Sequence, residues 1–66
     1  MTVIVNGSAV SVEPGTTIAD LVASASRTST GVAVALNDAV VIRSTWPTTT
    51  VQEQDRIEML EAAQGG

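Results

Sequence analysis

The stretch MTVIVNGSAVSV, residues 1–12, decides the fold of this chain. Two runs rich in β-branched residues flank Asn6 and Gly7, a pair that readily adopts the positive φ angles of a type I′ hairpin turn. With this pair as a two-residue loop, Val5 lies opposite Ser8. That register gathers the apolar residues of both strands on one face: Met1, Val3, Val5, Val10 and Val12. We therefore expect a β-hairpin with one buried face.

A short amphipathic helix is expected after the hairpin. Residues 13–15, Glu-Pro-Gly, end the second strand, and Thr17 with Asp20 three residues later has the spacing of a capping box. Apolar residues then recur at i, i+3, i+4 and i+7: Ile18, Leu21, Val22 and Ala25. This stripe predicts a helix that packs on the hairpin. The polar run at 26–31 marks a break after it.

Three further strands are predicted in the second half of the chain. Residues 32–36 alternate large and small side chains, and a turn at 37–38 leads to a strand at 39–43. Residues 44–50 are expected to form a loop, because a proline disfavours helix at the residue before it and cannot donate a ladder hydrogen bond. Residues 56–61 begin with alternating charged and apolar side chains, which indicates the last strand.

The predicted order ββ-α-ββ-β is that of an α+β domain with a mixed sheet of about five strands and one helix on one face. A chain of 66 residues has room for one small domain. We expect that domain to span residues 1–61 and a flexible tail to follow at 62–66.

Composition excludes several kinds of chemistry. The sequence has no Cys, His or Lys, so a thiolate nucleophile, a Ser-His-Asp triad and a Cys or His metal site are not expected. Three arginines against seven acids give a net charge of -4, which argues against nucleic acid as a partner. The first residues lack the features of a secretory signal, and no apolar run reaches the ~20 residues of a membrane span. A cytoplasmic protein without a membrane partner is expected.

The final pair Gly65-Gly66 carries the main functional signal. A free α-carboxylate has a pKa of about 3.3–3.7 and is ionised at neutral pH, so it can attack the α-phosphate of ATP. A backbone without Cβ atoms can enter a narrow channel in another enzyme. The six residues from Glu61 to Gly66 can reach about 20 Å. The alternative is that the two glycines are an inert end.

Several segments together resemble the ThiS-type sulfur carriers, members of the ubiquitin-like β-grasp superfamily that also contains the small subunit of molybdopterin synthase. The matching segments are 3–7 (VIVNG), 17–22 (TIADLV), 34–41 (VALNDAVV), 43–46 (RSTW), Val51, 55–60 (DRIEML) and 64–66 (QGG). Gln54 stands where the family often has a glycine, and Ala63 where a larger aliphatic residue is common.

The resemblance implies a role as a cosubstrate of partner enzymes and not as an enzyme. An E1-like adenylyltransferase (ThiF-type) would adenylate the Gly66 carboxylate with ATP and Mg, so the chain itself binds no cofactor. A desulfurase system would supply sulfur, and the Gly66 thiocarboxylate would donate it to a thiazole synthase (ThiG-type) in thiamine biosynthesis. Gly65 and Gln64 would thread the tail into the partner. No residue of this chain is catalytic in that scheme, and none binds a metal.

Three residues of the predicted domain are candidates for a functional role. Alternation that buries Ile57 and Met59 turns Leu60 to the uncovered face as a possible partner contact, whereas a bulge would place Leu60 in the core. Arg43 can contact a partner carboxylate, or pair with an acidic residue of this chain, Asp38 or Glu53. Trp46, the only aromatic residue, is expected to belong to the core. The acidic residues at 53–61 are interpreted as a solvated edge.

Four alternative functions stay open. A sulfur carrier for molybdopterin synthesis or for cysteine synthesis shares the fold and the chemistry. A ubiquitin-like protein modifier would use the same terminus to modify lysines. An interaction module would leave the two glycines without a reaction.

Overall fold

The computed structural model describes residues 1–25 and 31–61, so residues 26–30 of the predicted break at 26–31 and the predicted tail at 62–66 lie outside the described residues. Five strands form one sheet in the order β2-β1-β5-β3-β4, in which β1 and β5 are parallel and the other pairs are antiparallel. The elements are β1 (Thr2–Val5), β2 (Ser8–Ser11), α1 (Ile18–Ala25), β3 (Val32–Leu36), β4 (Ala39–Val40), the 3-10 helix η1 (Arg43–Thr48) and β5 (Arg56–Glu61). The predicted ββ-α-ββ-β order is confirmed.

The N-terminal hairpin has the predicted turn and register. Asn6 and Gly7 have φ angles of 49° and 84°, and Val5 pairs with Ser8. Val3 is fully buried. The other four apolar residues of that face are partly buried against the core: Met1, Val5, Val10 and Val12. The Asn6-Gly7 turn was sufficient to predict the pairing of the two strands, because a two-residue type I′ loop fixes their register.

Helix α1 begins with the predicted capping box. The Thr17 N–H donates to Asp20 Oδ2 at 3.0 Å, and the Asp20 N–H donates to Thr17 Oγ1 at 3.1 Å. The predicted stripe is correct for its first three members, which are buried: Ile18, Leu21 and Val22. Ala25 is exposed, so its assignment to the core was wrong. It is the last residue of the helix, and the part of α1 in the core ends at Val22.

The region at 39–50 differs from the prediction. The expected strand at 39–43 is short, since β4 ends at Val40, and the expected loop contains the 3-10 helix η1 with Pro47 inside it. The Thr45 hydroxyl donates to the Ile42 carbonyl at 2.8 Å and the Trp46 indole N–H donates to the Val41 carbonyl at 3.0 Å. Burial of Trp46 thus draws the chain out of the sheet, and the hydroxyl bond stabilises the turn.

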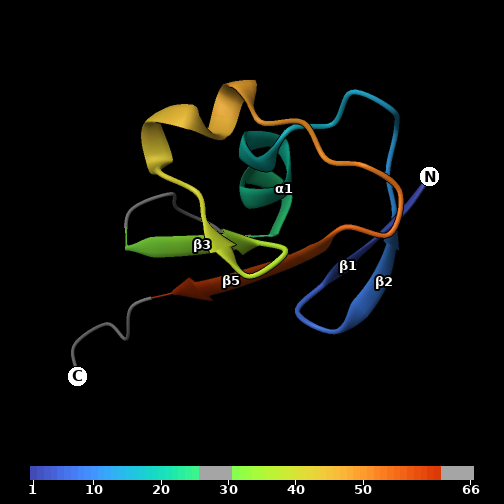
Figure 1. Ribbon diagram of the computed structural model, residues 1–66, viewed down its shortest axis with the longest axis horizontal. Helices are drawn as coiled ribbons and strands as arrows, with labels where there is room; N and C mark the ends of the chain where they lie inside the picture. The colour runs from blue at the N-terminus through green and yellow to red at the C-terminus, as the bar shows by residue number, and fades with distance from the viewer. Residues whose placement is uncertain (26–30, 62–66) are drawn as a thin grey trace.

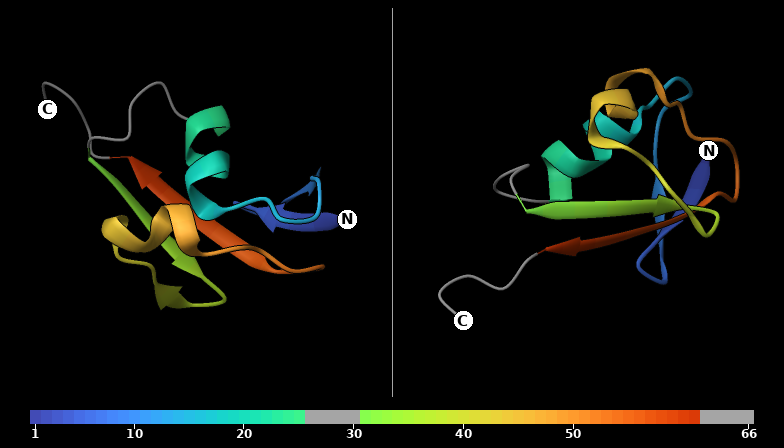
Figure 2. Two further views of the ribbon diagram at one scale, coloured as in Figure 1. Left: turned by 90° about the horizontal axis from the view of Figure 1, so that it is seen from above. Right: turned by 60° about the vertical axis from the view of Figure 1, so that its left-hand side comes forward.

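The core lies between the sheet and its two helices. Figures 1 and 2 show α1 and η1 on the same side of the sheet. Trp46 is 4% exposed, which confirms its predicted place in the core. The buried residues come from both helices, three strands and the segment after η1: Val3, Ile18, Leu21, Val22, Val34, Trp46, Val51, Ile57 and Met59.

The turn before β5 contains Gln54 in the left-handed region, at φ 68°. Its N–H donates to the Thr2 carbonyl at 2.7 Å, and this bond ties the turn to β1. Residues other than glycine pay about 1–2 kcal/mol for this conformation. Gln54 stands where the ThiS family often has a glycine, the residue that adopts positive φ without a steric penalty. The turn geometry is therefore consistent with the family resemblance.

Gln54→Gly is therefore expected to raise the free energy of unfolding by about 0.5 kcal/mol, since the relieved strain slightly exceeds the added chain entropy of the unfolded state. Gln54→Val should lower it by about 1–2 kcal/mol, because a β-branched side chain is least compatible with positive φ. Urea denaturation measures both changes. Equal stability of the glycine and valine variants would contradict the role of the φ angle, and Gln54→Asn is the control that tolerates it.

Candidate functional site

The chain reaches its final residues through β5, the central strand of the sheet. β5 lies between β1 and β3 and ends at Glu61. The three predicted site residues of the tail, Gln64, Gly65 and Gly66, lie outside the described residues. The described part of the site is therefore the strand that leads to them and the sheet surface around it.

Two asparagine side chains hold β5 from its two neighbours. Asn6 follows β1, and its amide bonds both backbone groups of Met59: Oδ1 accepts from the N–H at 2.8 Å and Nδ2 donates to the carbonyl at 3.3 Å. Asn37 follows β3, and its Oδ1 accepts from the Arg56 N–H at 2.9 Å. The Asn37 Nδ2 donates to Asp55 Oδ1 at 2.9 Å. Both asparagines have positive φ, and each is the first residue of a two-residue turn.

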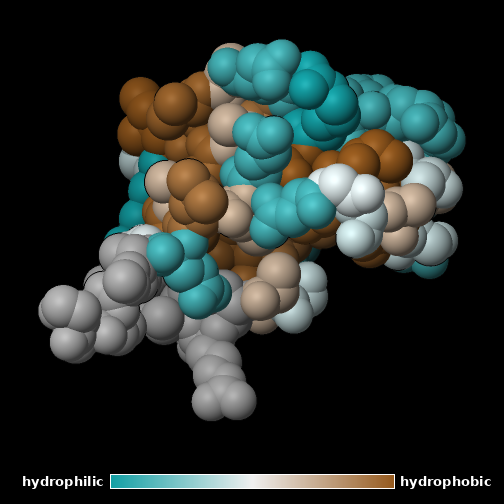
Figure 3. Space-filling view, turned by 90° about the horizontal axis from the view of Figure 1, so that it is seen from below, coloured by the Kyte–Doolittle hydropathy of each residue, from teal (hydrophilic) through white to brown (hydrophobic). Residues whose placement is uncertain are grey.

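The sheet face opposite the two helices carries exposed apolar side chains (Figure 3). Leu60 is 74% exposed and Val40 is 82% exposed. The Cα of Leu60 pairs with Ala33 in a regular ladder while Met59 is buried. The predicted orientation of Leu60 is thus confirmed, and the alternative of a bulge that buries it is wrong.

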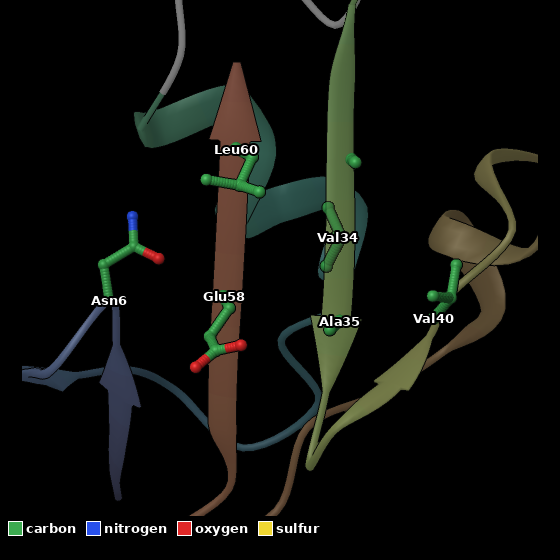
Figure 4. A pocket seen from close by; sticks show the side chains of 7 residues that line it. Asn6, Val34, Ala35, Val40, Glu58 and Leu60 are labelled. Atoms are coloured by element: carbon green, nitrogen blue, oxygen red, sulfur yellow. The ribbon is translucent and has the colours of Figure 1, made fainter. Parts of the chain in front are cut away.

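An open hollow with a volume of about 390 Å³ lies on this face, which we call the open face (Figure 4). Apolar side chains dominate its walls, and Glu58 places one carboxylate among them. Sequence reasoning found Leu60 but missed the hollow, because its walls come from four separate segments. The lining residues are Asn6, Ala33, Val34, Ala35, Val40, Glu58 and Leu60.

Arg43 does not line this hollow. It begins η1, and its guanidinium carbon lies 6.0 Å from the centroid of the Trp46 ring. The acidic partners considered for it have other contacts: Asp38 forms a bidentate ion pair with Arg56, at 3.2 and 2.8 Å, and Glu53 accepts from the Thr2 N–H at 2.8 Å. Because Leu60 lines the hollow and Arg43 does not, the structure does not bring these two residues into one site.

The acidic residues of the second half of the chain do not converge. Within residues 1–25 and 31–61, no group of three or more His, Cys, Asp or Glu side chains is arranged to hold a metal ion. No helix in the described part of the chain is long and apolar enough to cross a membrane.

Two exposed carboxylates have lowered pKa values. Hydrogen bonds from the Arg56 guanidinium, and then its charge, lower the pKa of Asp38 from its ordinary value of 3.8. The Thr2 N–H is the larger cause that lowers the pKa of Glu53 from 4.5, and the Gln54 amide adds to it. Both folded-state values lie below the unfolded-state values, so the ionised carboxylates favour the folded state.

The lowered pKa values of Asp38 and Glu53 predict that the folded state loses stability in acid. The contributions of both groups are complete above their unfolded pKa values, 3.8 and 4.5, and are lost as the pH falls through the lower folded values. Urea denaturation between pH 7 and pH 3 should show that wild type is more stable than Glu53→Gln at neutral pH. The difference should shrink as the pH falls below about 4.5. A difference that grows in acid would contradict the assignment.

The β2-β1-β5-β3-β4 mixed sheet with its covering helix defines a ubiquitin-like β-grasp fold. The model of the ThiS family matches residues 3–66, and this chain belongs to that family. Its membership and its fold support the role of sulfur carrier that the sequence predicts.

Two solved structures are similar over the whole chain. One is the crystal structure of a thiamine biosynthesis protein (ThiS) from Geobacter metallireducens, with 29% identity, a TM-score of 0.83 and full coverage of both chains. The other is an NMR structure of a thiamine biosynthesis protein from Geobacter metallireducens, with 29% identity and a TM-score of 0.80, which covers all of this chain and 88% of that one. No match was found among curated proteins.

Proposed function

We propose that this chain is a cytoplasmic sulfur carrier that supplies the sulfur of the thiazole ring in thiamine biosynthesis. The observation that carries the proposal is the match of residues 3–66, which include Gly65 and Gly66, to the ThiS family. Similar structures described as thiamine biosynthesis proteins support the choice of pathway.

The proposed reaction takes place at the Gly66 carboxylate. A ThiF-type adenylyltransferase binds ATP and Mg, a carboxylate oxygen attacks the α-phosphorus, and pyrophosphate leaves. A persulfide of the desulfurase system then attacks the carbonyl carbon of the acyl adenylate and displaces AMP. A thiol of that system cleaves the S–S bond of the acyl disulfide, which forms a disulfide on the donor and leaves the thiocarboxylate on Gly66. The resulting thiocarboxylate donates its sulfur to a ThiG-type thiazole synthase.

The chain's own residues suit a cosubstrate and supply no catalytic group in this scheme. Without cysteine the chain has no thiol to carry sulfur, so Gly66 is the proposed carrier position. Gly65 and Gln64 precede it in the segment that would enter the partner's nucleotide site. Mixed anhydride formation activates a carboxylate that is otherwise a poor electrophile.

Partner recognition is proposed to use the open face. Leu60 is exposed beside the start of the final segment, and the hollow around it is mostly apolar with one carboxylate, Glu58. In protein interfaces a few residues near the centre carry most of the binding energy, so one substitution there can have a large effect. Arg43 is a second proposed contact, at a separate place on the surface.

Leu60→Glu is expected to weaken binding of the chain to the ThiF-type enzyme by about 10- to 100-fold, because a carboxylate at the contact must be desolvated beside Glu58. Titration calorimetry measures the dissociation constants. Ile42→Glu is the matched control, since Ile42 is 67% exposed and does not line the hollow. Unchanged affinity of the Leu60 variant would exclude the open face as the docking surface.

The proposed adenylation is tested by ATP–pyrophosphate exchange with purified ThiF-type enzyme. Exchange should require the chain and should be absent when its C-terminal carboxylate is amidated. Absence of exchange with the unmodified chain and an active enzyme would contradict the proposal.

The enzyme that accepts sulfur from the chain distinguishes the proposed thiamine pathway from the alternatives. Transfer of sulfur to thiazole synthase, in preference to molybdopterin synthase or a cysteine synthase, is the expected result. Lysine isopeptides that end in Gly65-Gly66 on cellular proteins would instead favour the protein modifier. Full function of a chain with a capped C-terminus would favour the interaction module.

A further inference from the structure

The parallel ladder between β1 and β5 reaches further along β5 than the backbone of β1 does. The Ile4 N–H donates to the Asp55 carbonyl at 2.8 Å, and the Asn6 N–H donates to the Ile57 carbonyl at 2.9 Å. At Asn6, φ is 49° and the chain turns into the hairpin loop. β1 therefore cannot continue as a strand beside the second half of β5.

The next β5 residue that faces β1 after Ile57 is Met59, because alternate residues of a strand direct their backbone groups to the same neighbour. The Asn6 side chain bonds both of these groups, as acceptor from the N–H at 2.8 Å and as donor to the carbonyl at 3.3 Å. A carboxamide carries the same donor and acceptor as a peptide group. Asn6 thus adds one ladder step after its own backbone has turned away.

This step lies close to the end of the strand. β5 ends at Glu61, two residues after Met59, and there it pairs with β3 through Leu60 opposite Ala33 and Glu61 opposite Val32. Met59 is also the residue immediately before Leu60, whose side chain lines the hollow of the open face. The Asn6 amide therefore fixes β5 from the β1 side at the point where the docking surface meets the approach to the terminus.

We propose that Asn6 is a positioning residue for the carrier reaction: its amide holds the backbone of Met59 and so fixes the origin of the segment that carries Gly66 to the partner's nucleotide. The inference rests on the proposed function. Reacting groups must approach to about 3–3.5 Å, and misplacement by about 1 Å can cost about 100-fold in rate. A fixed origin matters because Gly66 lies seven residues beyond Met59.

Asn37 provides a matched control at the other end of the same strand. It also has positive φ, at 51°, and its side chain also makes two hydrogen bonds to the β5 region, with Asp55 and Arg56. Glycine keeps the positive φ of either turn without strain, so Asn6→Gly and Asn37→Gly each remove a side-chain clamp and preserve the turn. Only the first loosens β5 near its end.

The test combines amide exchange with adenylation kinetics on the full chain. In Asn6→Gly, the Met59 amide should exchange at least about 10-fold faster relative to the Ile57 amide. The kcat of adenylation by the ThiF-type enzyme should fall about 5- to 10-fold. Because Asn6 also lines the hollow, KM is measured as well, and a rise in KM with kcat unchanged would assign Asn6 to docking and overturn the inference. Asn37→Gly should leave both the Met59 amide and kcat close to wild type.

Equal kcat values for the two glycine variants, or unchanged protection of Met59 in Asn6→Gly, would overturn the inference. If Asn6→Gly does not fold, Asn6→Asp takes its place with kcat as the deciding measurement: it keeps the acceptor that protects the Met59 N–H and loses the donor to the carbonyl, and a kcat equal to that of Asn37→Gly would overturn the inference. Failure of the wild-type chain to be adenylated would instead overturn the proposed function, and the exchange rates would still decide whether Asn6 holds β5.

Discussion

Replacing Trp46 with alanine is expected to remove a large part of the free energy of unfolding at 25 °C. Trp46 is the only aromatic residue, and from its position on η1 it is 4% exposed in the core with residues of α1 and the sheet. Truncation of a buried tryptophan costs about 3–5 kcal/mol. A domain of this size has a free energy of unfolding of about 3–10 kcal/mol, so this loss is a large fraction of it.

The effect is measured by urea denaturation followed by far-UV circular dichroism, because the variant lacks the fluorescent side chain. Trp46→Phe separates packing from hydrogen bonding: it keeps an aromatic ring and loses the bond from the indole N–H to the Val41 carbonyl. We expect it to lose about 1–2 kcal/mol. An unfolding midpoint of Trp46→Ala within error of wild type would contradict the assignment of this side chain to the core.

Deleting Gly66 is expected to abolish adenylation, with a loss of at least about 100-fold in kcat/KM. The shortened chain still ends in a carboxylate, now on Gly65, but it is one residue shorter. One extended residue spans about 3.3–3.6 Å, which exceeds the tolerance for attack on the α-phosphorus.

The same deletion should not change the stability of the domain formed by residues 1–61. Residues 1–61 are unchanged, so the free energy of unfolding should equal that of wild type. The deleted chain should also inhibit adenylation of wild type competitively, because the open face is retained. Adenylation at the wild-type rate would show that the position of the carboxylate is not fixed by chain length.

Much of the fold could be predicted because its signals are local. The Asn6-Gly7 turn sets the hairpin register, the Thr17 and Asp20 pair starts α1, and alternation along β5 correctly placed Leu60 on the uncovered face. Each of these depends on residues within a few positions of one another. The order of the strands then follows the β-grasp resemblance.

The errors came from tertiary effects. The strand predicted at 39–43 ends early because Trp46 is drawn into the core, and Pro47 is accommodated in a 3-10 helix. The open-face hollow escaped prediction because its lining combines Asn6, in the turn after β1, with residues of β3, β4 and β5. The sequence predicted only the role of Asn6 in its turn. Its hydrogen bonds to Met59 escaped prediction because they join residues 53 positions apart.

The central claim is that Gly66 carries sulfur, and intact-mass spectrometry tests it most directly. The purified chain is incubated with the ThiF-type enzyme, ATP, Mg and the desulfurase system, and fragmentation then locates any modification. The account predicts a mass gain of one oxygen-to-sulfur exchange, located at Gly66 and lost when ATP is omitted. An unmodified mass in the complete system, with each partner shown to be active, would contradict it.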